Sequence, residues 1–230
     1  MSNRSFYSVC LILLISSSHA QTNRNDLYDW DKRMKDIGFV DVCFWEPSIQ
    51  YHLFYATANN FLKKPIYNSK LTKVWLHPRA AQMLIHAQDL LQKEHPELAL
   101  FVYDAARPIE AQRIMSAWAK QTKNDNFVAD PSKGGGQHNY GMAVDVTLAN
   151  HKGEGLPMGT SFDFFGPEAR TDKENDLLKN RRITPIEYKN RQLLRRIMES
   201  AGFTSIRNEW WHFNACTREE AMSNYILIDR

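Results

Sequence analysis

Apolar residues recur every three or four positions in several segments, which is the spacing of an amphipathic helix. The clearest such segment begins at Pro78 and stops at His95-Pro96. A second helix is expected over residues 185–201, because Thr184-Pro-Ile-Glu187 combines a capping box with proline at the first helical position, and Gly202 is a typical helix end. A third is expected over residues 109–119, after Pro108.

Shorter runs rich in apolar and aromatic residues predict strands over residues 98–103, 143–148 and 209–213. Alternation in the second run places Asp145 on the opposite face from Val144 and Val146. The helices and strands follow one another without a regular βαβ rhythm, and no linker divides the chain. The sequence therefore predicts an α+β fold: a single compact domain with a central antiparallel or mixed sheet and helices packed around it.

Residues 1–20 have the pattern of a secretory signal peptide. Arg4 precedes an apolar run from Phe6 to Ile15, and small residues occupy the −3 and −1 positions of a cut after Ala20. The run is half the length of a membrane span, which needs about 20 residues, so a membrane anchor is the weaker alternative. We expect export to the periplasm or cell surface of a bacterium, with residues 21–230 as the mature domain and no stable membrane insertion after cleavage.

Composition describes an ordinary globular protein, with 43% hydrophobic residues and 12% aromatic residues in 230. The formal net charge is only +3, and the 29 basic residues are scattered among 26 acidic ones. Nucleic-acid-binding proteins are usually more basic, so no nucleic-acid partner is expected.

Two cysteines, Cys43 and Cys216, remain after removal of residues 1–20. In an oxidising compartment they could form one disulfide. Two separate buried thiols are an equal alternative, since cysteine packs as a small hydrophobic residue.

Two of the eight histidines have neighbours that suggest chemistry. His138 follows the loop Gly134-Gly-Gly136 and precedes Asp145 by seven residues, so a loop-to-strand turn could direct both side chains at one ion. His212 follows two tryptophans. Two histidines and one carboxylate are a common zinc set in hydrolases, because they leave a coordination position for water.

A carboxylate near such an ion can take the proton of the attacking water, and Glu209 is the natural candidate. A regular strand would place Glu209 and His212 on opposite faces, so Glu209 is expected in the preceding turn or at a bulge. Arg107 lies between a strand and a helix-starting proline. It either forms a surface salt bridge with Asp104 or stabilises the oxyanion that develops on a peptide carbonyl.

Several segments, in order along the chain, resemble the zinc D-alanyl-D-alanine dipeptidases of the VanX type, in peptidase family M15. The most specific are Gln137-His-Asn-Tyr-Gly-Met-Ala-Val-Asp145-Val-Thr-Leu148 and Glu209-Trp-Trp-His212. The others are Tyr55-Ala-Thr-Ala-Asn-Asn-Phe61 with Lys64-Pro-Ile-Tyr67, Tyr103-Asp-Ala-Ala-Arg107-Pro108 and Met158-Gly-Thr-Ser-Phe-Asp163. Together they cover roughly residues 50 to 215.

The resemblance implies one Zn²⁺ per chain and a small dipeptide substrate, D-Ala-D-Ala. It gives His138, Asp145 and His212 the positions of the zinc ligands, Glu209 that of the general base and acid, and Arg107 that of the transition-state stabiliser. Asp163 matches the acid that meets the free ammonium group of the dipeptide. Without the resemblance, Asp163 would be interpreted as a helix or turn cap.

One position departs from the family pattern: Gly136 stands where a serine is usual, two residues before the first zinc histidine. A hydroxyl that could contact the substrate is lost, which affects affinity or specificity. A zinc carboxypeptidase that trims muropeptides and a non-catalytic zinc-stabilised binding module are the alternatives. Export favours turnover of cell-wall dipeptide over antibiotic resistance, and the oligomeric state stays open.

Overall fold

The computed structural model describes residues 28–68, 70–124 and 127–230, so the signal peptide predicted at residues 1–20 lies outside the described part. The helices are α1 (Trp30–Asp36), α2 (Val42–Trp45), α3 (Pro78–Glu94), α4 (Ile109–Thr122), α5 (Glu174–Lys179), α6 (Pro185–Ser200) and α7 (Arg218–Asn224). The strands are β1 (Val40–Asp41), β2 (Gln50–Tyr51), β3 (Trp75–Leu76), β4 (Leu98–Asp104), β5 (Ala143–Asn150), β6 (Thr204–Ser205) and β7 (His212–Asn214). Short 3₁₀ helices lie at Phe54–Ala56, Pro131–Lys133, Gln137–Tyr140 and Pro167–Ala169.

A five-stranded mixed sheet in the order β2-β4-β5-β7-β6 forms the centre of the domain. Strand β2 runs parallel to β4, and the other neighbours are antiparallel. A separate pair joins β1 and β3. These elements form one α+β domain, as the sequence predicts.

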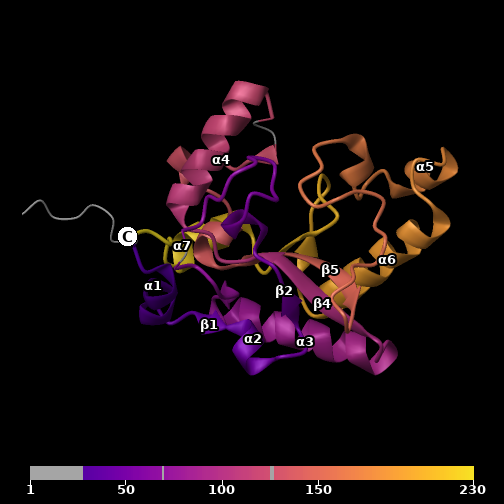
Figure 1. The fold of residues 1–230 in the computed structure, drawn as a ribbon, viewed down its shortest axis with the longest axis horizontal. Coiled ribbons are helices and arrows are strands. Elements are labelled where there is room, and N and C mark those ends of the chain that lie inside the picture. The colour runs from indigo at the N-terminus through magenta and orange to yellow at the C-terminus, as the bar shows by residue number, and fades with distance from the viewer. Residues whose placement is uncertain (1–27, 69, 125–126) are drawn as a thin grey trace, which may run out of the picture.

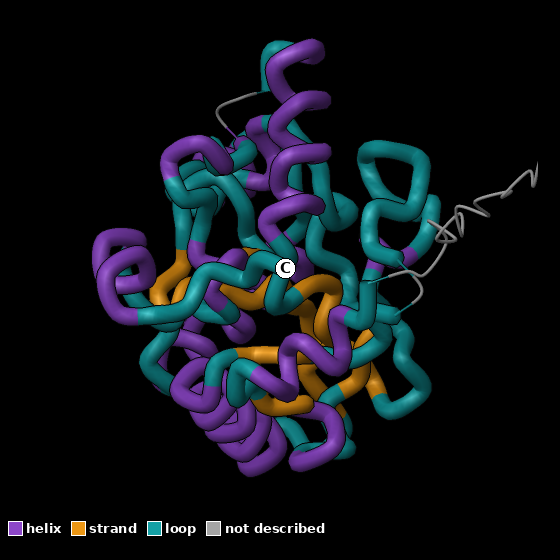
Figure 2. Tube along the Cα trace, turned by 90° about the vertical axis from the view of Figure 1, so that its left-hand side faces the viewer, coloured by secondary structure: helices purple, strands orange, loops and turns teal. Residues whose placement is uncertain are grey.

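Helices α3 and α6 pack against one face of this sheet. Figure 1 shows α3 along one side of strands β4 and β5, with α4 on the opposite side, and Figure 2 shows the strands between them from a second direction. The apolar positions of α3 and the alternating residues of β5 meet in this layer and are fully buried: Ala80, Leu84, Ala87, Leu91, Val144, Val146 and Leu148. Burial of these side chains is the main stabilising contribution here.

Both long predicted helices have the expected starts. In α3, Pro78 occupies the first turn, and the helix ends before His95-Pro96. In α6, the backbone N–H of Thr184 donates to Glu187 and the backbone N–H of Glu187 donates to the Thr184 hydroxyl, which completes the capping box.

A bulge in β4 turns a polar residue onto the other face of the sheet. Val102 pairs with Val146, but the next pair is Asp104 with Asp145, so Tyr103 is an extra residue. Regular alternation would put Asp104 on the same face as Val102, against the apolar core. The extra residue instead places Asp104 beside Asp145. Asp145 in turn pairs with His212 of β7, so three polar residues form a row across three strands.

The strand predicted over residues 209–213 is shorter than expected, since β7 begins only at His212. Trp210 and Trp211 form a turn in which both rings are buried, and the Trp210 indole N–H donates to the Thr160 hydroxyl at 2.7 Å. Burial of two large rings in succession is incompatible with the alternation of a strand that has one polar face. Glu209 therefore lies before the turn, as the alternation argument required.

Cys43 and Cys216, the two cysteines among the described residues, are free thiols. Both are half-buried and pack against the main apolar core. The structure thus corresponds to the alternative of separate thiols. Over the described residues, no helix combines the length and apolar character needed to cross a membrane.

Candidate active site

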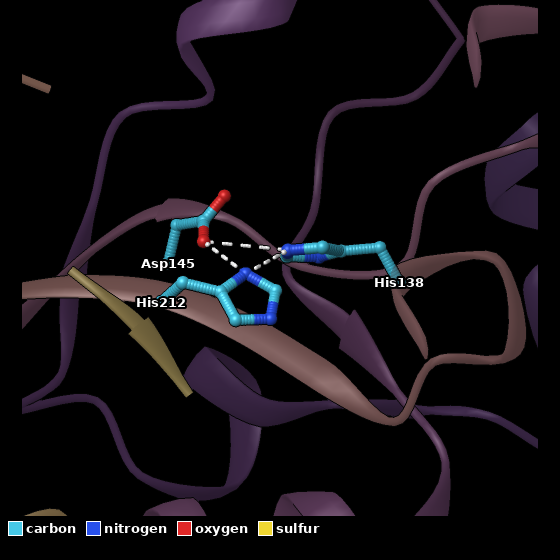
Figure 3. A group of neighbouring side chains, drawn as sticks. All are labelled: His138, Asp145 and His212. Atoms are coloured by element: carbon cyan, nitrogen blue, oxygen red, sulfur yellow. Dashed lines mark hydrogen bonds and ion pairs between the residues drawn. The ribbon is translucent and has the colours of Figure 1, made fainter. Parts of the chain in front are cut away.

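Three side chains from separate elements converge at one point on the face of the sheet opposite α3 and α6. Nδ1 of His212 lies 3.0 Å from Oδ1 of Asp145 and 3.1 Å from Nε2 of His138. The distance from Nε2 of His138 to Oδ1 of Asp145 is 3.3 Å. Figure 3 shows the two imidazole rings and the carboxylate pointing toward one another. These are the three residues that the sequence predicted as metal ligands.

Each imidazole has a partner for its other nitrogen. Nδ1 of His138 lies 2.7 Å from the carbonyl oxygen of Ala105, and Nε2 of His212 lies 2.8 Å from the amide oxygen of Asn214. Both partners accept hydrogen bonds, so each histidine carries its proton on the outer nitrogen. The inner nitrogens are then left with free lone pairs, which is the arrangement that metal-binding histidines need.

Asp145 completes the set as an anion. Burial alone would raise the pKa of its carboxyl group, but the adjacent His138 and His212 lower it below its ordinary value. Two imidazoles and one carboxylate, with their donor atoms within 4.8 Å of one another, suit a divalent ion such as Zn²⁺. The donor set and its outer hydrogen bonds therefore fit the metal that the sequence analysis expected.

Arg107 forms a buried ion pair, not the surface pair considered from the sequence. Its Nε and Nη2 donate to one oxygen of Asp104 at 2.9 and 2.7 Å, and its Nη1 donates to Gln112 at 2.9 Å. The other oxygen of Asp104 accepts from the Tyr67 hydroxyl at 2.6 Å. Burial opposes the charge, but Asp104 keeps the pKa of Arg107 well above its ordinary value. The guanidinium is thus a fixed cation, and its Nη2 lies 3.7 Å from Asp145.

Glu209 lies beside the three candidate metal ligands, at the end of the loop before β7. Burial raises the pKa of its carboxyl group to about 7. A carboxyl group with a pKa near neutrality can both accept and donate a proton under physiological conditions.

Asp163 lies in the loop between β5 and α5 and adopts a left-handed backbone conformation with φ of 60°. Its Oδ1 accepts from the Tyr55 hydroxyl at 2.8 Å, whereas its Oδ2 is buried without a hydrogen-bond partner in the described structure. Burial raises the pKa of this carboxyl group well above its ordinary value. A buried acceptor without a partner is costly, so this oxygen is a candidate for contact with a cationic ligand.

Arg191 of α6 holds both ends of the segment that carries Asp163. Its Nε donates to the Met158 carbonyl at 2.6 Å, and its Nη1 donates to the Glu168 carbonyl at 2.8 Å. The same guanidinium lies over the Trp210 ring, 5.7 Å from its centroid. One buried side chain thus connects the Asp163 segment to the turn next to Glu209.

A cavity of about 310 Å³ contains the whole set. The six residues predicted from the sequence all line it: Arg107, His138, Asp145, Asp163, Glu209 and His212. Aromatic side chains, among them Tyr55 and Phe165, line other parts of its wall. The volume suits a small molecule of a few residues.

The sequence assigned no role to Asn214 or Tyr55, and it suggested Asp104 only as a surface partner of Arg107. Asn214 follows His212 by two residues on a strand, so period-two alternation was the signal for their shared face. Asp104 precedes Arg107 by three residues, but its burial depends on the bulge in β4. Tyr55 contacts Asp163 across 108 residues of chain, and no local pattern predicts that contact.

Comparison with known proteins agrees with this geometry. Residues 35–226 match the Peptidase M15 family, described as D-ala-D-ala dipeptidase. The chain is 33% identical to the D-alanyl-D-alanine dipeptidase of Escherichia coli K12, over 83% of this chain and 90% of that protein. It is 29% identical to that of Enterococcus faecium, over 77% and 91% of the two chains, and 28% identical to that of Streptomyces coelicolor, over 77% and 90%. The chain belongs to peptidase family M15, among its D-Ala-D-Ala dipeptidases.

Proposed function

We propose that this protein hydrolyses D-Ala-D-Ala to two molecules of D-alanine at a zinc site formed by His138, Asp145 and His212. The observation that carries the proposal is the convergence of these three donors in a cavity that also holds an acid with a raised pKa, a fixed arginine and an unpartnered carboxylate. The relatives that are named D-alanyl-D-alanine dipeptidase support the choice of substrate.

One Zn²⁺ per chain is the expected cofactor, because two histidines and a carboxylate form a typical catalytic zinc set. When bound, the ion supplies Lewis-acid chemistry, which lowers the pKa of water and polarises a peptide carbonyl. The outer hydrogen bonds from His138 to Ala105 and from His212 to Asn214 keep the donor lone pairs directed inward.

Glu209 acts as the general base and then as the general acid. It accepts a proton from the attacking water and transfers that proton to the leaving amine, for which a pKa near 7 is suited. Arg107 stabilises the negative charge that develops on the carbonyl oxygen. Because Asp104 and Gln112 already hold the guanidinium, little reorganisation is needed during the reaction.

Asp163 selects short substrates by binding their free ammonium group. Its Oδ2 has no partner in the described structure, so an incoming cation would satisfy a buried acceptor. A longer peptide presents a neutral amide at that point and leaves the carboxylate without a countercharge. This argument disfavours the alternative of a carboxypeptidase acting on muropeptides.

The site of action is proposed from residues 1–20 alone. Their signal-peptide pattern supports export of the mature protein to the periplasm or cell surface of a bacterium. There it would consume D-alanyl dipeptide released from the cell wall, a role in turnover or nutrition.

The deciding experiment measures release of D-alanine by purified, metal-loaded protein from D-Ala-D-Ala and from a muropeptide ending in D-Ala-D-Ala. Glu209→Ala is the control for metal-loaded but inactive protein. Hydrolysis of the dipeptide alone is expected. Cleavage of the muropeptide would identify a carboxypeptidase, and activity on neither substrate would favour a non-catalytic binding module.

A further inference from the structure

The charges that line the active-site cavity are not all paired. Among the described residues, its acids are Asp145, Asp163 and Glu209, and its only basic residues other than histidine are Arg107 and Arg218. Asp145 lies against the two histidines, and Arg107 is bound by Asp104. Arg218 forms no ion pair with any acid in the described part of the chain.

Arg218 is nevertheless held in a defined position. It is the first residue of α7, and its Nε donates to the Gly135 carbonyl at 2.9 Å, while its Nη2 donates to the Lys133 carbonyl. These carbonyls belong to the loop that leads into His138. The remaining nitrogen, Nη1, has no hydrogen-bond partner within the described residues. The side chain therefore presents a fixed, unneutralised positive charge at the cavity wall.

Gly136 follows Gly135, whose carbonyl accepts from Arg218, and it provides no side chain for ligand binding. It also lines the cavity, in an extended conformation with φ of −115° that any residue can adopt. A Cβ atom there would lie 3.2 Å from Cβ of Ala129, so the wall is closely packed at this point. A serine at position 136 would offer a hydroxyl to a ligand, and Gly136 does not. The Arg218 guanidinium, which is bound to the carbonyl of Gly135, is the nearby polar group.

A dipeptide with free ends carries one positive and one negative charge. Asp163 offers a carboxylate for the ammonium group, and a second group of opposite charge is required for the carboxylate. Arginine binds carboxylates through a rigid fork of donors, more specifically than a hydroxyl does. Of the two arginines at the cavity, only Arg218 has no carboxylate partner among residues 28–68, 70–124 and 127–230.

We propose that Arg218 binds the C-terminal carboxylate of the dipeptide and thereby makes this chain selective for substrates with a free carboxyl terminus. The inference rests on the proposed dipeptidase function and assigns to that site a specificity-determining residue. Asp163 and Arg218 together would require both the amino and the carboxyl terminus of the substrate to be free and charged.

The test compares two substrates, D-Ala-D-Ala and its C-terminal amide, on metal-loaded wild type, Arg218→Gln and Arg218→Lys. In Arg218→Gln, KM for the free acid should rise about 10- to 100-fold, as expected for loss of a charged hydrogen bond. KM for the amide should change little, so the wild-type preference for the free acid should largely disappear. Arg218→Lys should recover part of that preference, since it restores the charge without the fork.

Arg113→Gln is the matched control, because Arg113 is an exposed arginine of α4 outside the cavity. It should retain the wild-type preference. A second measurement needs no turnover: calorimetric binding of D-Ala-D-Ala and its amide to metal-loaded Glu209→Gln, with and without Arg218→Gln. The added substitution should weaken binding of the free acid alone.

The outcomes separate this inference from the function on which it rests. If wild type hydrolyses neither substrate, the proposed function fails. If wild type hydrolyses D-Ala-D-Ala but Arg218→Gln keeps both its KM and its preference for the free acid, the role of Arg218 is refuted while the function stands. An equal rise in KM for both substrates would also refute it, because that pattern indicates a distorted loop and not a lost carboxylate contact.

Discussion

Asp145 and His212 face each other as paired residues of β5 and β7, and Oδ1 of one lies 3.0 Å from Nδ1 of the other. This pairing brings together two candidate metal ligands that are 67 residues apart in the chain. Because both strands are central in the sheet and buried, the distance between the two donors is set by backbone hydrogen bonding. Two of the three candidate ligands are therefore positioned by the sheet, and the third, His138, comes from the 3₁₀ helix just before β5.

The first prediction concerns Asn214, which accepts the outer hydrogen bond of His212 at 2.8 Å. Asn214→Ala should weaken zinc binding by about 10- to 100-fold, since the ring loses the partner that sets its tautomer. Competition with a chromophoric chelator measures the affinity. Asn180→Ala, at an exposed position after α5, is the control. Equal affinities in the two variants would contradict the positioning role.

The second prediction concerns how the buried Glu209 carboxyl group changes the free energy of unfolding with pH. In the metal-free folded protein burial raises the pKa of Glu209 to about 7, from an ordinary value of 4.5. The folded state thus retains a proton that the unfolded chain has lost, so stability falls as the pH rises from 4.5 to 7. Glu209→Gln avoids this loss and should be more stable than wild type at pH 8, by about 1 to 3 kcal/mol.

Urea denaturation of the two metal-free proteins measures this difference, which should vanish below pH 4.5. The same variant should retain zinc but lose turnover. Simultaneous loss of zinc binding would indicate that Glu209 supports the metal site structurally.

The third prediction concerns Asp163. Asp163→Ala should raise KM for D-Ala-D-Ala by about 10- to 100-fold, because the ammonium group loses a charged partner. Steady-state kinetics decide this, with Asp176→Ala on the exposed side of α5 as the control. An unchanged KM would exclude the ammonium-binding role.

The fourth prediction concerns Arg191, which is almost fully buried and bonds to the carbonyls of Met158 and Glu168. Arg191→Met should destabilise the protein by about 3 kcal/mol, because it leaves the Met158 and Glu168 carbonyls without their donor, whereas Glu174 keeps its ion pair with Arg195. It should also raise KM, since the Asp163 segment loses its anchor. The control is Arg196→Met, on the same helix as Arg191, which breaks only an exposed ion pair with Glu94 of α3. It should have little effect on the free energy of unfolding in urea. Similar stability losses in both variants would contradict the anchoring role.

The fifth prediction concerns the two free thiols. Burial raises the pKa of Cys43 to about 12 and that of Cys216 to about 11. At pH 8 both are therefore protonated, and alkylation by iodoacetamide should be far slower than in the unfolded chain, with Cys216 reacting before Cys43. Mass spectrometry without reducing agent should show two alkylated cysteines after denaturation. A mass lower by two hydrogens, with no alkylation, would reveal a disulfide.

Local sequence patterns were sufficient to predict helices α3 and α6 and strand β5. Capping residues, proline at the first helical turn and apolar periodicity act within a few residues, so they are visible in the sequence. The same is true of Asp145, whose neighbours Val144 and Val146 face the core by alternation. The position of Glu209 before the strand also followed from alternation, although the turn at Trp210 and Trp211 shortened that strand.

The sequence by itself determined the fold class, the family and the six candidate site residues. Local periodicity predicts the helices and strands, and the ordered motifs indicate the family and the candidate residues. Only the tertiary structure decided how these residues are held. The bulge at Tyr103 brings Asp104 to Arg107, Tyr55 reaches Asp163 from a distant segment, and Arg218 lies against the loop before His138. Such contacts depend on sheet register and on the packing of segments far apart in the chain, and no pattern within a single segment encodes them.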